Sequence, residues 1–131
     1  MLGMVSRETL VHLGSVLAAL SLLVVSGWLF PALDGSLLVF VYLCYHALIF
    51  GGAHAYFAWR GEAGTVPVPS RWRFLWALAA WIVLGVVGAL GPDWTVQGVP
   101  TDAVMAGLGV VVLLGYWILE AQDGYRSSRP T

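Results

Sequence analysis

Histidines and tyrosines are the residues of this sequence with the clearest capacity for chemistry. His46 lies in the middle of a long apolar segment, where an ionisable side chain is costly and is a functional candidate by default. At 100° per residue, Tyr42 and His46 fall on one helix face, which Tyr45 and Tyr56 flank. These groups need hydrogen-bond partners, so we expect the face to point into a helical bundle or toward a partner. Such a face could line a channel or transport pathway.

The two other histidines have matching positions in neighbouring segments. His12 follows Arg7 by five residues, and His54 precedes Arg60 by six. If the segments are antiparallel helices, both imidazoles lie at about the same depth, where they could ligate a haem iron from both sides. We name His12 and His54, with His46 as a further candidate, as haem b ligands. The alternatives are interfacial side chains for His12 and His54 and a neutral, hydrogen-bonded imidazole for His46.

The composition of the chain indicates the class of protein that holds these residues. The chain has 131 residues, of which 60% are hydrophobic and 10% are charged, with a formal net charge of −1. A soluble globular protein is usually about half apolar and a quarter charged. The lack of a basic excess argues against a nucleic-acid partner, and the single cysteine, Cys44, excludes an intrachain disulfide and a cysteine-based metal site. We therefore expect a membrane protein.

Four apolar segments are long enough to cross a bilayer, which requires about 20 helical residues. Their ends carry turn and capping signals such as Pro31, Asp34 and the Thr101-Asp102 pair. The first segment is longer than a signal-peptide core, so we expect it to be a retained anchor. The predicted fold is an all-α, up-down-up-down membrane four-helix bundle in one transmembrane domain, with a short cytoplasmic tail. The predicted spans are residues 9–30, 36–59, 72–90 and 103–119, and the tail is 120–131.

The arginines predict the orientation of the chain. Cytoplasmic loops of membrane proteins carry an excess of Lys and Arg. All six cations here are Arg, and they lie before the first span, between the second and third, and after the fourth. The other two loops hold only aspartates as charged residues. We therefore expect a multi-pass protein of the cell membrane with both termini in the cytoplasm, and we interpret the arginines between residues 60 and 73 as this topological signal.

Small residues mark the faces where helices should pack in a membrane. The fourth span carries Ala103, Gly107, Val111 and Gly115 at four-residue spacing. The third span carries glycines at three-residue spacing, from position 85 to position 91. We expect these two helices to pack tightly on each other or on a second copy of the chain.

These patterns leave three functions open. The favoured one is a non-catalytic subunit or oligomeric scaffold of a membrane complex, because the short loops leave little outside the membrane and no catalytic motif occurs. The second is a haem b or quinone-associated redox anchor. The histidines are loosely similar to those of small haem b anchors of respiratory complexes, although such anchors usually have more in-span histidines and charged quinone- or propionate-binding residues. The third is a small channel or transporter along Tyr42, Tyr45, His46 and Tyr56.

Overall fold

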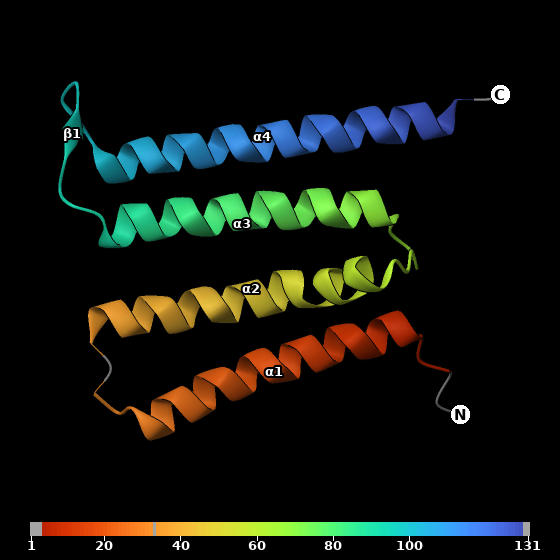
Figure 1. The fold of residues 1–131 in the computed structure, drawn as a ribbon, viewed down its shortest axis with the longest axis horizontal. Coiled ribbons are helices and arrows are strands. Elements are labelled where there is room, and N and C mark those ends of the chain that lie inside the picture. Colours follow the sequence, from red (N-terminus) through yellow and green to blue (C-terminus); the bar gives the residue numbers. More distant parts are fainter. Residues whose placement is uncertain (1–3, 33, 130–131) are drawn as a thin grey trace. The chain divides into compact units, whose positions relative to one another are not determined.

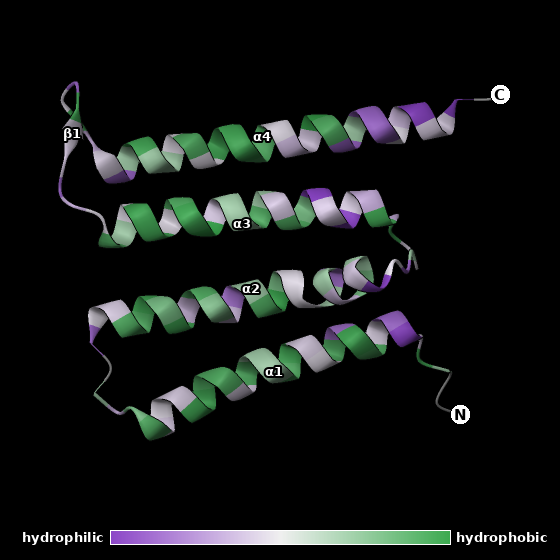
Figure 2. Cartoon of the chain, viewed as in Figure 1, coloured by the Kyte–Doolittle hydropathy of each residue, from purple (hydrophilic) through white to green (hydrophobic). Residues whose placement is uncertain are grey.

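The computed structural model describes residues 4–32 and 34–129 and contains four long helices, shown in chain order in Figure 1. The predicted four apolar helices are confirmed, since each is long and apolar enough to cross a membrane. Figure 2 shows hydrophobic residues along most of each helix and hydrophilic ones concentrated near several helix ends. The helices are α1 (Arg7–Leu29), α2 (Gly35–Arg60), α3 (Val68–Leu90) and α4 (Thr101–Ser128).

Side-chain caps and a glycine define the ends of the first two helices. The Ser6 hydroxyl accepts a hydrogen bond from the Thr9 amide at the start of α1, and the Asp34 carboxylate accepts one from the Leu37 amide at the start of α2. Such caps satisfy amides that have no partner within the helix. Gly61 ends α2 in the left-handed conformation, with φ of 66°, which glycine adopts without steric cost.

The connection between α3 and α4 forms a small hairpin, which hydropathy did not predict. Strands β1 (Thr95–Val96) and β2 (Val99–Pro100) pair antiparallel, with Val96 opposite Val99. The turn residues Gln97 and Gly98 both have positive φ, as a two-residue hairpin turn requires. The predicted Thr101-Asp102 cap is wrong, because Pro100 is the N-cap and Thr101 is already helical.

The last helix is longer than the predicted fourth span. It continues nine residues beyond Leu119, into the segment that is predicted as a tail. No proline interrupts the sequence between Pro100 and Pro130, and Gly124 is accommodated within the helix. The polar residues after Leu119 therefore extend α4 as a helix beyond the apolar span.

The chain divides into two compact units, one ending at Leu75 and the other beginning at Trp76, so α3 begins in the first unit and ends in the second. In unit 1, α1 and α2 pack antiparallel at close range. A Cβ atom added to Gly52 would lie only 2.8 Å from the Ser15 Oγ and 3.1 Å from its Cβ. The small buried residues Ala19 and Ala53 also allow the backbones to approach.

In unit 2, α3 packs on α4 along one face of each helix. The Trp81 indole N–H donates a 2.8 Å hydrogen bond to the Gly109 carbonyl, and a Cβ added to Gly88 would lie 3.5 Å from the Met105 Cβ. The earlier residue of α3, Trp81, meets the later residue of α4, Gly109, so these parts of the two helices run antiparallel. Gly109, the small residue that meets the tryptophan, is not on the predicted ridge of α4. The single four-helix transmembrane domain stays a prediction.

Candidate functional site

Arg71, in the first turn of α3, is completely buried and forms the centre of a polar cluster at one end of unit 1. Its Nε donates to the Val66 carbonyl at 3.2 Å, and its Nη2 donates to the Ala63 carbonyl at 3.0 Å. The guanidinium also lies over the Phe57 ring, 4.8 Å from the ring centroid. Arg71 thereby joins the connection between α2 and α3 to both of these helices. A buried charge is tolerated only with such partners.

Glu8, in the first turn of α1, supplies the opposite charge. Its Oε1 accepts a 2.8 Å hydrogen bond from Arg71 Nη2, and the two form a salt bridge. The same carboxylate accepts from the backbone amide of Thr65 at 2.9 Å and from the Thr65 hydroxyl at 2.8 Å. Gly64 permits this approach, because a Cβ at that residue would lie 2.7 Å from Glu8 Oε2. Both carboxylate oxygens are thus occupied by contacts that join α1 to the α2–α3 connection.

The structure brings the predicted pair His12 and His54 together. Their rings lie edge to face, with centroids 5.7 Å apart. Arg71 Nη1 lies 3.1 Å from His54 Nδ1, and since a guanidinium only donates, the imidazole nitrogen accepts. We call Glu8, His12, His54, Thr65 and Arg71 the Arg71 cluster.

Haem ligation by these histidines stays a prediction. With His54 Nδ1 accepting from Arg71, a neutral ring carries its proton on Nε2, so iron ligation through Nε2 would require that proton to move or to be lost. Gly52, two residues before His54, lies against Ser15 of α1. Within residues 4–32 and 34–129, no group of three or more His, Cys, Asp or Glu side chains is arranged to hold a metal ion.

A second, more exposed ionic group lies at the same end of unit 1. Glu62 forms salt bridges to Arg7 at 2.7 Å and to Arg60 at 2.8 Å. The Arg7 Nη2 also donates to the Tyr56 hydroxyl at 2.9 Å. Tyr56 therefore belongs to this arginine-bearing end. The hydrogen bond from Arg60, followed by that from Arg7, lowers the pKa of the Glu62 carboxyl below its ordinary value.

This lowered pKa predicts an acid-dependent contribution to stability. Because the pKa of Glu62 is lower in the folded state, its stabilising effect is present above the ordinary pKa of 4.5 and is lost as the pH falls through the folded value. We expect the melting temperature of wild type to be higher than that of Glu62→Gln at neutral pH. This difference should disappear on acidification. Thermal unfolding of both proteins in a neutral detergent across this pH range measures the effect. A difference that stays constant with pH would contradict it.

The predicted polar face of α2 forms a chain of ring contacts away from the Arg71 cluster. The His46 ring lies 4.9 Å from that of Tyr42, 5.3 Å from that of Tyr45 and 5.9 Å from that of Phe50. The His46 Nδ1 lies 2.7 Å from the Tyr42 carbonyl one turn earlier, to which a protonated Nδ1 donates. This contact satisfies one imidazole nitrogen within the helix itself. A transport pathway along these residues stays a prediction.

Sequence analysis missed the contribution of Glu8, Thr65 and Arg71. The arginine distribution predicts only that Arg71 lies beside the membrane, and it gives no indication that Glu8 is its partner. The depth argument that paired His12 with His54 applies equally to Glu8 and Arg71, because opposite charges beside helix ends at the same membrane face can meet. A comparison of the chain with protein-family models, curated proteins and solved structures found no match.

Proposed function

We propose that the protein is a non-catalytic subunit or oligomeric scaffold of a membrane complex, and that it associates with a second copy through α4. We further propose an up-down-up-down arrangement in the cell membrane with both termini in the cytoplasm. The arginine distribution supports this orientation. The length and apolar character of all four helices support the membrane location.

The observation that carries the proposal is a face of α4 on which two glycines have no side chain packed against them within the described part of unit 2. Three small residues and a valine form a ridge there, which we call the α4 ridge: Ala103, Gly107, Val111 and Gly115. Among residues 4–32 and 34–129, Cβ atoms added to Gly107 or Gly115 would meet no atom within 4 Å, other than neighbouring residues and the backbone of α4 itself. Within unit 2, α4 instead meets α3 through Met105 and Gly109. The α4 ridge thus retains the shape that allows two membrane helices to approach closely.

The chemistry of the Arg71 cluster also supports a structural part for this chain. Its charged groups bond to one another and to the backbone of the α2–α3 connection. The Glu8 carboxylate is held by Arg71 and Thr65 together. Interactions of this kind fix the geometry of the helical hairpin, and the outer helix faces are then available for association.

Replacement of Gly107 by Leu tests the proposal. A leucine on the α4 ridge would force the associating helices apart, and overpacking of a close contact costs about 1–3 kcal/mol. We expect the dissociation constant of the oligomer to rise by about 5- to 150-fold, which corresponds to that energy. Native mass spectrometry and dilution-dependent crosslinking in a mild detergent measure it.

Gly124→Leu is the matched control. Gly124 is also open, lies in the same helix beyond the apolar span, and at 100° per residue is about 180° from Gly115. This variant should associate like wild type. A wild-type protein that is monomeric and copurifies with no membrane partner, or a Gly107→Leu oligomer of unchanged stability, would contradict the proposal.

A further inference from the structure

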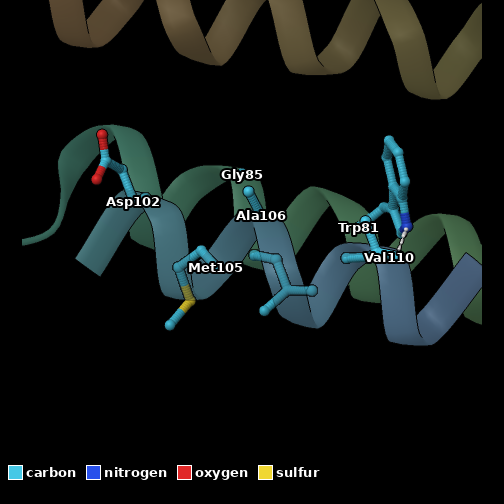
Figure 3. A pocket seen from close by; sticks show the side chains of 9 residues that line it. Trp81, Gly85, Asp102, Met105, Ala106 and Val110 are labelled. Atoms are coloured by element: carbon cyan, nitrogen blue, oxygen red, sulfur yellow. Dashed lines mark hydrogen bonds between the residues drawn. The ribbon is translucent and has the colours of Figure 1, made fainter. Parts of the chain in front are cut away.

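An elongated pocket lies between α3 and α4 within unit 2. Its volume is about 460 Å³, and we call it the α3–α4 slot. Figure 3 shows Asp102 toward one end of the slot and Trp81 toward the other, with Met105, Ala106 and Val110 of α4 between them. Val110 lies eight residues after Asp102, which corresponds to about 12 Å along the helix. The slot is therefore elongated along α4 and apolar, except where Asp102 borders it.

A second pocket adjoins the slot at its Asp102 end. This pocket, the loop cup, has a volume of about 250 Å³ and is formed by the end of α3, the hairpin connection and the start of α4. Gly88 and Asp102 line both pockets, so the two are contiguous. The cup is more polar than the slot, because Asp93, Asp102, Thr95 and Thr101 all border it.

The two pockets together match a molecule with one apolar and one charged end. Among the residues that line the cup, the charged ones are Asp93 and Asp102, and both are acidic. Trp94 also lines the cup, and the face of an indole ring attracts cations. Two carboxylates and an aromatic ring favour a positively charged head, while an anionic head would be repelled.

We propose that the α3–α4 slot and the loop cup bind a single-chain amphiphile with an ammonium head. The apolar chain lies in the slot between Gly88 and Trp81, and the ammonium lies in the cup against Asp93 and Asp102. Burial of the chain supplies affinity, and the two carboxylates select the sign of the charge. This inference is independent of the proposed self-association, since neither pocket includes a residue of the α4 ridge.

Decyltrimethylammonium is the probe for this site, with the full chain held in a neutral maltoside detergent. Native mass spectrometry counts the probe molecules retained by the folded protein as the probe concentration rises. We expect one saturable decyltrimethylammonium per chain. Decyl sulfate, which has the same chain and the opposite charge, and tetramethylammonium, which lacks the chain, should each bind at least about tenfold more weakly.

Two substitutions separate the contributions of the slot and the cup. Ala106→Leu fills the slot, and displacing part of the chain should weaken binding by about 10- to 200-fold. Ala89→Leu makes the same change on α3 at a residue outside the slot lining and should bind like wild type. Asp102→Asn retains the shape of the side chain and removes one carboxylate charge. It should therefore weaken the binding of decyltrimethylammonium and reduce the preference of the site for this probe over decyl sulfate.

Asp123→Asn is the charge-matched control, near the other end of α4, and should leave binding unchanged. Retention of all three probes to the same extent, or equal binding by Ala106→Leu, Asp102→Asn and wild type, would overturn the proposal, because both results indicate unspecific partitioning. Far-UV circular dichroism establishes that each variant is folded. If Ala106→Leu does not fold, Asp102→Asn still decides the outcome, since it changes charge at almost constant volume.

Discussion

Arg71→Met is expected to destabilise the fold by about 3–5 kcal/mol, the usual cost of removing one partner from a buried ion pair. The methionine fills much of the same volume but leaves the Glu8 carboxylate without its counter-charge, at a site where that side chain is only 16% exposed. The Val66 and Ala63 carbonyls also lose their guanidinium donor. Titration of the protein from mild detergent into dodecyl sulfate, followed by circular dichroism, measures the free energy of unfolding.

Two further variants identify the origin of this loss. Arg60→Met removes an arginine that also pairs with a glutamate, but its side chain is 54% exposed, so water replaces most of the interaction. The free energy of unfolding of this variant should be close to that of wild type. Glu8→Gln retains the shape of Glu8 but loses the charge that faces Arg71. Its free energy of unfolding should lie between those of wild type and Arg71→Met. Equal stabilities for Arg71→Met and Arg60→Met would show that the Arg71 cluster does not stabilise the hairpin.

Hydropathy was sufficient to predict the four helices, because a helix that crosses lipid must be apolar over nearly its whole length. It could not predict the position of Arg71. A count of arginines per loop places this residue beside the membrane, but the count is the same whether the guanidinium is solvated or buried. Its burial depends on how residues 61–67 fold, with Gly61 and Gly64 in left-handed conformations. Periodicity contains no information on such a connection.

The packing faces were predicted only in part. Small residues at regular spacing show where helices can approach, but several faces of one helix can satisfy this condition. On α3 the predicted glycine series does meet α4, through Gly88 and Met105. On α4 the contact with Trp81 instead uses Gly109, which lies outside the four-residue series. The choice depends on the large side chain across the interface, and spacing within one helix cannot reveal it.

The histidines show the same limit at the level of a single atom. Matching distances from Arg7 and Arg60 predicted that His12 and His54 lie at similar depth, and the rings are neighbours. Depth does not reveal what each ring nitrogen contacts. Arg71 comes from a third helix and occupies His54 Nδ1. Whether an imidazole can bind iron depends on such a contact, and residue type and spacing do not specify it.

Gly52→Val should be the second strongly destabilising substitution, with a loss of about 1–3 kcal/mol from overpacking between α1 and α2. The first added carbon would lie 2.8 Å from the Ser15 Oγ and 3.1 Å from its Cβ. Rotation of the serine hydroxyl can relieve the first contact but not the second, and the branched methyl groups of valine extend further. The two helices must therefore separate, and the same dodecyl sulfate titration measures the cost.

A second substitution provides a direct test of this mechanism. Ser15→Gly removes the atoms that valine would strike, so the double variant should recover part of the stability that Gly52→Val loses. Gly14→Val, on α1 where an added Cβ meets no other described residue within 4 Å, should have a stability close to that of wild type. Because the Arg71 cluster joins α1 to α2 and α3 near this contact, separation of the helices should also weaken the cluster. The double variant with Gly52→Val and Arg71→Met should then lose less free energy of unfolding than the sum of the two single losses. Strict additivity would show that the two interactions stabilise unit 1 independently.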